Sequence, residues 1–389
     1  MSFARLELVQ HEIHAHYRAL RAIRTRKALE RSALWAEIGG EITRVLDGVE
    51  RGDRAPAATP ARAGALRAVA WNIQRGARLD DLRRAVVAPP FSDADVFLLS
   101  EVDVGLGRSG NRNVARELAE TLGMSYAFGV SYLALSDDFG DDAAGVENTL
   151  ALSGSAVISR FPIARVENID LPAIRDKFHS SEKRLGKKRA LLAEIALPDG
   201  PLAVVACHLD SNASPAQRAR QLAGILDSVD RSGVARALVG GDFNTSTYDV
   251  SSTLALARDL LHKLFITGFR ATVDNYLTPE KRYEQPVFDL LRARNFAVDA
   301  FNDRANGTYF YDLTDPYILD RSQKLVGRLL TRLLVRLLRP WNGRVPARLD
   351  WFAGRNVTPV TSAVERPLAA ADGRPLSDHS AVIVDLALR

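Results

Sequence analysis

From Leu66 onward the chain carries short apolar runs, each followed by polar residues, and this pattern restricts the fold most. Runs of this length are typical of buried or half-buried strands. Helical patterns lie between some of them, at 113–122, 215–229 and 285–294. The sequence therefore predicts layers of mixed helices and strands, although periodicity alone fits both a sandwich of two sheets and a doubly wound sheet. The apolar runs are Leu66–Trp71, Val96–Leu99, Ala156–Ile158, Leu191–Leu197, Leu202–Ala206, Ala237–Val239, Leu349–Phe352 and Ala381–Leu388.

The first 65 residues have a different pattern. Apolar residues recur at steps of three and four between residues 3 and 49, which predicts helices. Residues 51–65 are rich in Ala, Pro, Arg and Gly and have no periodicity, as is typical of a linker. We therefore expect a helical extension over residues 1–50, a linker over 51–65 and the main domain over 66–389.

Composition excludes several classes of protein. Cys207 is the single cysteine, so the chain has neither a disulfide framework nor a cysteine-based metal site. The N-terminus lacks the apolar core of a signal peptide, and no apolar run has the length of a membrane span. The net charge of +5 mildly favours anionic partners. These features predict a cytoplasmic protein.

Polar side chains gather at the ends of the predicted strands. One such residue alone is weak evidence, because Asp or Asn after a strand is commonly a turn residue. Together they form a set of carboxylates, amides and imidazoles that a shared sheet edge would bring close. Hard oxygen ligands of this kind suit Mg²⁺, Mn²⁺ or Ca²⁺. The set is Asn72, Glu101, His208, Asp242, Asn244, Asp350, Asp378 and His379.

Seven segments in fixed order carry these residues, namely Ala70–Ile73, Leu99–Asp103, Ser155–Ile163, Cys207–Asp210, Gly240–Asn244, Arg348–Phe352 and Leu376–Ser380. Together, across residues 67–389, they resemble the endonuclease/exonuclease/phosphatase superfamily, which includes deoxyribonuclease I, bacterial sphingomyelinases and inositol polyphosphate phosphatases. The resemblance implies a four-layer α/β/β/α sandwich, with two sheets face to face and helices outside. It also implies a divalent-metal-dependent phosphoester hydrolase, with a phosphodiesterase as the favoured type.

The resemblance implies which residues would hold the metal. Glu101 would bind the ion, Asn72 would lie beside Glu101, and Asp378 would lie near the ion. Mg²⁺ is the expected metal, with Mn²⁺ and Ca²⁺ as alternatives. Some relatives carry an acidic residue two positions after the first-strand Asn, where this chain has Gln74. That difference favours one tight metal site over two.

The remaining residues would carry the chemistry, according to the same resemblance. Asp242 would orient or deprotonate the attacking water, and Asn244 would hold a phosphate oxygen. His208 would donate a hydrogen bond to the phosphate. His379 would act as acid or base, with Asp350 fixing its tautomer and charge. Abasic-site endonucleases lack a histidine at the position of His208, so the chain is more similar to the deoxyribonuclease, sphingomyelinase and phosphatase branches.

Two basic segments bear on the substrate. Residues 320–340 predict an inserted amphipathic helix with arginines on one side and leucines on the other, which suits a membrane interface or packing onto the domain. The loop 175–189 suits a nucleic-acid backbone or a solvated surface. We therefore expect a phosphoester substrate, either nucleic acid or a phospholipid head group. Peripheral membrane contact would run through residues 320–340, and no protein partner can be predicted from the sequence.

A second class of function competes with the hydrolase. The same fold with a decayed site would be a membrane-binding or partner-binding protein without activity. The complete set of polar residues at the strand ends favours the enzyme.

Overall fold

The computed structural model of this 389-residue chain describes most of the sequence. The described residues are 3–54, 60, 64–136, 146–180, 182–245, 254, 258, 268, 271, 273, 275–281, 283–314, 319, 320, 323, 327–366, 368–370 and 372–388.

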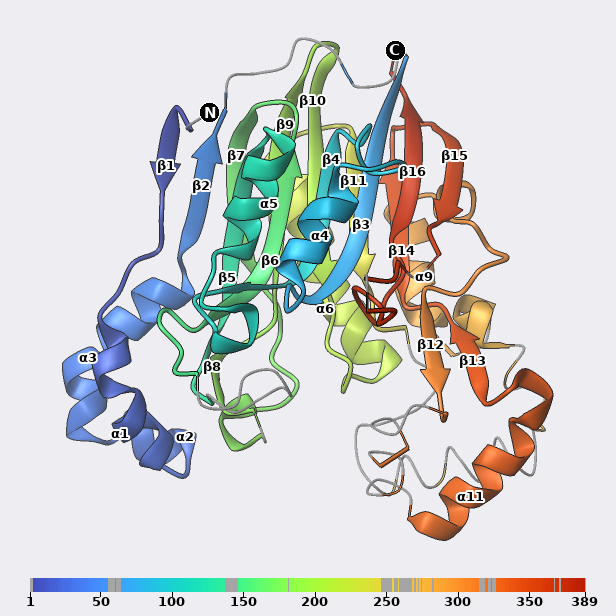
Figure 1. The fold of residues 1–389 in the computed structure, drawn as a ribbon. Coiled ribbons are helices and arrows are strands. Elements are labelled where there is room, and N and C mark those ends of the chain that lie inside the picture. Colours follow the sequence, from blue (N-terminus) through green and yellow to red (C-terminus); the bar gives the residue numbers. More distant parts are fainter. Residues whose placement is uncertain are drawn as a thin grey trace.

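Nine strands form the larger sheet within these ranges (Figure 1). In order of hydrogen-bonded neighbours they are β1 (Arg5–Glu7), β2 (Val49–Asp53), β5 (Ser125–Ala134), β6 (Leu152–Ser159), β4 (Val96–Val104), β3 (Ala65–Arg75), β16 (Val382–Ala387) and β15 (Pro359–Val364), with β8 (Arg184–Gly186) beside β5. The central strands β3 and β4 run parallel, so both end at the same edge.

A smaller sheet lies against the first. Its five strands are, in order, β14 (Asp350–Arg355), β11 (Ala237–Asp242), β10 (Gly200–His208), β9 (Arg189–Leu197) and β7 (Ile163–Asp170). Here β10 and β11 form the parallel pair, so they too end side by side. A separate hairpin consists of β12 (Tyr309–Asp312) and β13 (Arg344–Ala347).

Helices cover the outer face of each sheet. The described α-helices are α1 (Tyr17–Ala22), α2 (Arg26–Glu30), α3 (Ala33–Leu46), α4 (Leu79–Val86), α5 (Val114–Leu122), α6 (Pro215–Ser232), α9 (Gln285–Ala293) and α11 (Arg328–Leu337). Side chains of α3, α4 and α5 pack on the larger sheet, and those of α6 and α9 pack on the smaller one.

A third apolar cluster fills the space between the two sheets. Leu98 and Val157 of the larger sheet belong to it together with Val204 and Leu238 of the smaller sheet, and all four are fully buried. The layers are therefore helix, sheet, sheet and helix, which confirms the predicted four-layer sandwich. All eight predicted apolar runs overlap strands, because strands buried on both faces read as continuous apolar sequence.

The N-terminal region contains two strands that the sequence did not predict. Helices α1 to α3 lie within residues 3–49, and β1 and β2 extend the larger sheet beside β5. Residues 51–53 were expected in a linker and instead lie in β2. Glu50 of that strand is buried, where its carboxylate accepts hydrogen bonds from the Val9 amide and the Asn113 side chain. The charged residues of β2 explain why the sequence pattern did not predict this strand.

The basic helix expected over residues 320–340 is interrupted. Gly327 has φ of 85°, and α11 begins after it at Arg328. Residues 321, 322 and 324–326 of the predicted helix lie outside the described residues. Among the described residues, no helix combines the length and apolar character that crossing a membrane requires.

Candidate active site

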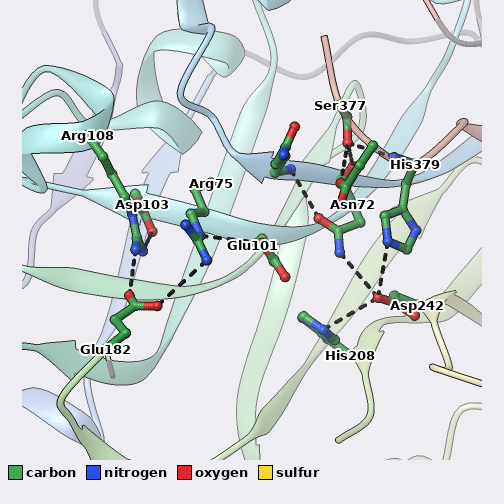
Figure 2. Close-up of polar contacts among 12 residues, drawn as sticks. Asn72, Arg75, Glu101, Asp103, Arg108, Glu182, His208, Asp242, Ser377 and His379 are labelled. Carbon is green, nitrogen blue, oxygen red and sulfur yellow. Dashed lines mark hydrogen bonds and ion pairs between the residues drawn. The ribbon is translucent and has the colours of Figure 1, made fainter. Parts of the chain in front are cut away.

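The parallel strand pairs of both sheets end at one end of the sandwich, and their last side chains meet there. Asn72 comes from β3 and Glu101 from β4, whereas His208 and Asp242 are register partners on β10 and β11. Asp350 of β14 pairs across from Asp242. The two sheets therefore supply opposite sides of one site (Figure 2).

His379 is held by contacts on several sides. Its Nδ1 lies 2.8 Å from Asp350 Oδ2. The Trp71 indole N–H donates to the His379 carbonyl over 3.0 Å, and the His379 amide donates to Ser377 Oγ over 3.1 Å. Burial alone would lower the pKa of His379, but the charges of Asp350 and Asp242 outweigh it and raise that pKa well above its ordinary value. The site thus favours a cationic imidazole.

Asp242 lies at the centre of the polar contacts. Its Oδ2 accepts a hydrogen bond from Asn72 Nδ2 over 3.2 Å. The same oxygen is 3.5 Å from His208 Nε2 and 3.9 Å from His379 Nε2. Burial, the largest influence, raises the pKa of Asp242 above its ordinary value. A carboxylate with a raised pKa and two imidazoles beside it is suited to accept a proton.

Asn244 turns the chain directly after β11. Its φ is 49°, its amide donates to Asp242 Oδ1 over 2.8 Å, and its side-chain Nδ2 donates to the Leu209 carbonyl over 2.9 Å. The residue therefore ties the ends of β10 and β11 together beside the site. Its expected contact with a phosphate oxygen stays a prediction.

Glu101 is placed by an irregularity in its strand. The register between β4 and β6 shifts between Ser100 and Val102, and Glu101 has φ of 53°. Such a bulge redirects a side chain, and non-glycine residues with positive φ are concentrated at functional sites. Burial would raise the pKa of Glu101, but the positive charges of His208, Arg75 and other cations lower it to about 2. The carboxylate is therefore ionised at neutral pH.

His208 is held in its neutral form, unlike the ionised Glu101. Burial, followed by the charge of Lys188, lowers its pKa to about 4. At neutral pH the imidazole is uncharged and has one N–H to donate.

Asp378 is next to the site, and Ser377 connects it to Asn72 and His379. Its side chain is exposed, and Ser377 Oγ is 3.5 Å from its Oδ1. In the described part of the chain, no hydrogen bond links Asp378 to Glu101 or Asn72. Its expected place near a metal stays a prediction.

Two groups of side chains have the donor atoms for a cation. Asp242, Asp350 and His379 each offer one ligand atom, and these atoms lie within 4.8 Å of one another. In that group, however, Asp350 and His379 already pair with each other. Glu101 is ionised and makes no hydrogen bond to any described residue, although Arg75 Nε lies 3.8 Å from its Oε2. Its free oxygens, with the neighbouring Asn72 amide, fit a hard divalent cation.

Sequence reasoning missed a polar network behind Glu101. Arg75 Nη2 lies 3.6 Å from Glu182 Oε2, and Arg108 pairs with both Glu182 and Asp103 (Figure 2). Glu182 is 3% exposed although its sequence neighbours suggest a solvated basic loop. Buried carboxylates require cationic partners, so the excess of cations at 175–189 was a signal for an acidic group among them.

The cations of the loop 175–189 mostly have partners inside the protein. Lys183 Nζ donates to the Arg21 carbonyl over 2.9 Å, and Lys187 Nζ lies 2.6 Å from Asp170 Oδ2. Arg189 Nε lies 2.5 Å from the other oxygen of Asp170. These contacts leave few of the cations free to meet a nucleic-acid backbone.

Comparisons with solved structures give similar chains of low identity. An endonuclease/exonuclease/phosphatase from Beutenbergia cavernae DSM 12333 has 19% identity and a TM-score of 0.47, over 83% of this chain and 72% of that chain. Sphingomyelinase C from Streptomyces griseocarneus has 16% identity and a TM-score of 0.44, over 82% and 99%. The human Nocturnin catalytic domain has 15% identity and a TM-score of 0.42, over 86% and 98%.

A search of curated proteins gives no match. The family described as the Endonuclease/Exonuclease/phosphatase family matches residues 69–379, which is most of the chain and includes all seven ordered segments at least in part. The chain therefore belongs to the endonuclease/exonuclease/phosphatase family.

Proposed function

We propose that this protein is a divalent-metal-dependent phosphodiesterase, in a family whose members are phosphoester hydrolases. One observation carries the proposal. Asp242 lies between the Asn72 amide and two imidazoles, and one of those imidazoles, His379, is backed by Asp350. This arrangement provides a proton acceptor, hydrogen-bond donors and a stabilised cation within one small site. Phosphoester hydrolysis requires each of them.

Each side chain of the site has its own role in the proposed hydrolysis. Asp242 orients the attacking water and accepts its proton, which its raised pKa favours. The cationic His379 faces the phosphate and stabilises the negative charge of the transition state, while Asp350 keeps its ring oriented. The neutral His208 and the Asn244 side chain hold phosphate oxygens.

A hard cation would complete the site. Glu101 and Asn72 would hold Mg²⁺ or Mn²⁺, with Asp378 as a neighbouring acid. The ion would supply Lewis-acid polarisation of a phosphoryl oxygen.

The direct test is hydrolysis of bis(p-nitrophenyl) phosphate with Mg²⁺ or Mn²⁺. We expect His379→Ala and Asp242→Asn to lower kcat by about 10²–10⁴-fold, the usual contribution of acid–base groups. The exposed His179 provides a matched control, and His179→Ala should keep wild-type activity. Circular dichroism would check folding. Full activity in both site variants would contradict the proposal and favour the decayed-scaffold alternative.

For the substrate, we propose a phospholipid head group at an anionic membrane surface. Helix α11 supports this choice because its outer face mixes apolar and basic residues. Leu329 is 82% exposed and Leu333 45% exposed, whereas Leu338 packs inward beside Tyr276 and Val345. Exposed arginines flank these leucines along the helix, at Arg328, Arg332 and Arg336. Such a face suits the interface of an anionic bilayer.

The position of α11 supports the same idea. β12 begins at Tyr309, which bridges to His379. Helix α11 lies beyond the β12–β13 hairpin, at the end of the sandwich where β3 and β4 end (Figure 1). The ring centroids of Tyr309 and His379 are 5.2 Å apart. A membrane bound to α11 would therefore bring head groups near the site.

Vesicle co-sedimentation tests this contact. Wild-type protein should bind phosphatidylserine vesicles, and a variant with Arg328, Arg332 and Arg336 changed to Glu should bind far less. A variant with Arg220, Arg231 and Arg292 changed to Glu is the matched control on α6 and α9. Equal vesicle binding by all three proteins would remove the proposed role of α11. Nucleic acid would then be the remaining substrate class, tested with plasmid DNA and RNA.

A further inference from the structure

A small cavity lies beside the candidate active site, on the far side of Glu101. Its volume is about 40 Å³, which is room for about three waters or one phosphate-sized group. Glu101 and His208 line it and also belong to the active site. In Figure 2, Glu101 lies between the Asp242 group on one side and the Arg75, Arg108 and Glu182 group on the other. The cavity therefore adjoins the place where the reacting phosphate would bind.

Positive side chains dominate the lining of this cavity. Besides Glu101, the charged residues that line it are cations: Arg75, Arg108, Arg184, Lys188 and Arg189. Ser131, Ser153 and Ser155 add polar groups. A cationic and polar lining suits an anion better than an apolar ligand.

Two of these cations are fully engaged by carboxylates. Arg108 Nε lies 2.6 Å from Asp103 Oδ2, and its guanidinium also pairs with Glu182. Arg189 pairs with two carboxylates, and its Nη2 lies 2.6 Å from Asp47 Oδ1. Their charges are compensated without any ligand.

Lys188 is the cation of this lining that carboxylates compensate least. Glu182 is shared by Arg75, Arg108 and Arg184, so one negative charge faces three guanidinium groups. Lys188 is half-buried and forms no ion pair with any carboxylate that the structure describes. Burial lowers the pKa of Lys188 to about 8, so most of the ammonium groups remain charged at pH 7. A positive excess in a partly desolvated place attracts an anion strongly.

We propose that this cavity binds a second anionic group of the substrate, a phosphate adjacent to the phosphoester that is cleaved. Lys188 and Arg184 are its main contacts, and Arg75 completes the lining next to Glu101. The inference rests on the proposed function, since that function places the reacting phosphate beside the cavity. A nucleotide and a phosphorylated lipid head group share this chemistry.

The binding test uses inorganic phosphate and metal-free protein, so it does not depend on turnover. Calorimetry should detect phosphate binding to the wild type and a loss of affinity of about tenfold or more in Lys188→Met, equivalent to one charged contact. Lys27→Met changes an exposed lysine of α2 and is the matched control. If Lys188→Met fails to fold by circular dichroism, Arg184→Gln takes its place. Absence of binding to the wild type would overturn the inference. So would a loss of affinity in His379→Ala with none in Lys188→Met, because phosphate would then occupy the reaction centre.

Matched substrates then test whether hydrolysis prefers a substrate with an extra phosphate. They also test whether that phosphate belongs to a nucleotide or to a lipid head group. One pair is thymidine 5′-(p-nitrophenyl phosphate) with and without a 3′-phosphate. The other is phosphatidylinositol with and without a 4-phosphate, presented in vesicles. The extra phosphate should raise kcat/KM about tenfold or more in one pair, and Lys188→Met should abolish that preference. Wild-type hydrolysis with no preference in either pair would overturn the inference and leave the proposed function intact. Failure to hydrolyse any substrate with metal present would instead contradict the proposed function, and phosphate binding would still decide whether the cavity takes an anion.

Discussion

His379 Nδ1 lies 2.8 Å from Asp350 Oδ2, and the two side chains are 6% and 0% exposed. The contact fixes the ring so that Nε2 faces Asp242, 3.9 Å away. Asp350→Asn keeps the size of the side chain but removes the charge that stabilises the imidazolium. We expect kcat on bis(p-nitrophenyl) phosphate to fall by about 10²–10⁴-fold with little change in KM, because the lost interaction acts mainly in the transition state.

Asp289→Asn is the control for this prediction, since Asp289 is an exposed carboxylate on α9, remote from the site in sequence and packing. Its kinetics should match the wild type. An unchanged kcat in Asp350→Asn would mean that the buried pair is structural only.

Metal binding should depend on Glu101. Its carboxylate is ionised, with a pKa of about 2, and it makes no hydrogen bond to a described residue, so it gains most from a cation. Removing the charge in Glu101→Gln should weaken Mg²⁺ binding by more than about tenfold, because even outer-shell partners of metals contribute 10–100-fold. The thermal midpoint of the wild type should rise with added Mg²⁺, and that of Glu101→Gln should rise much less.

Asp242→Asn separates the two groups that have donor atoms for a cation. Asp242 belongs to the group that also contains Asp350 and His379. If Asp242→Asn loses the Mg²⁺-induced shift and Glu101→Gln keeps it, the metal is held by the group of Asp242, Asp350 and His379 instead of by Glu101.

The stability of the metal-free protein should depend on pH through His208. Burial, with the charge of Lys188, lowers its folded pKa to about 4, whereas an unfolded histidine titrates near 6.5. The unfolded chain therefore binds more protons between these values. Stability from this group is fully present above about pH 6.5 and is lost as pH falls towards 4, by about 3 kcal/mol in total.

Urea unfolding at pH 7 and pH 5 in the presence of EDTA measures this effect. His208→Gln should lose less unfolding free energy on acidification than the wild type, and His179→Gln, at an exposed position, should behave like the wild type. Identical pH dependence in all three proteins would show that His208 is not the buried neutral group.

Much of the fold could be predicted because its central strands are buried on both faces. β5 escaped prediction although all ten of its residues are buried, since Ser, Gly and Tyr interrupt its apolar pattern. β2 escaped because Glu50 and Arg51 make it look like surface, and only tertiary hydrogen bonds to Val9 and Asn113 explain a buried glutamate.

The candidate site likewise contains some residues that the sequence predicts and others that it does not. Asp242 and His208 come shortly after apolar runs, so their position at a sheet edge can be predicted from local sequence. The pairing of Arg75 with Glu182 cannot, because the residues are far apart in the chain and either one alone reads as a solvated charge. The lining of the cationic cavity cannot be predicted from sequence patterns for the same reason, because its residues come together only in the folded chain.

A buried ion pair supports the loop that follows His208. Arg218 of α6 and Glu284 beside α9 are both 0% exposed, and Arg218 Nε donates to Glu284 Oε2 over 3.2 Å. Arg218 Nη1 also donates to the Ala213 carbonyl over 2.6 Å. Glu284→Gln would leave the guanidinium charge buried without its carboxylate. We expect a loss of about 3–5 kcal/mol in the free energy of unfolding.

The exposed pair of Arg292 and Asp289 provides the matched comparison, and Asp289→Asn should change stability by no more than about 1 kcal/mol. Urea denaturation of both variants measures the difference. The double variant Arg218→Met with Glu284→Leu should recover most of the loss, because apolar side chains of similar volume replace a buried pair with little penalty. If Glu284→Gln is as stable as the wild type, Arg218 must be solvated or neutralised by other groups, and the pair would not be what fixes α6 and α9 behind His208.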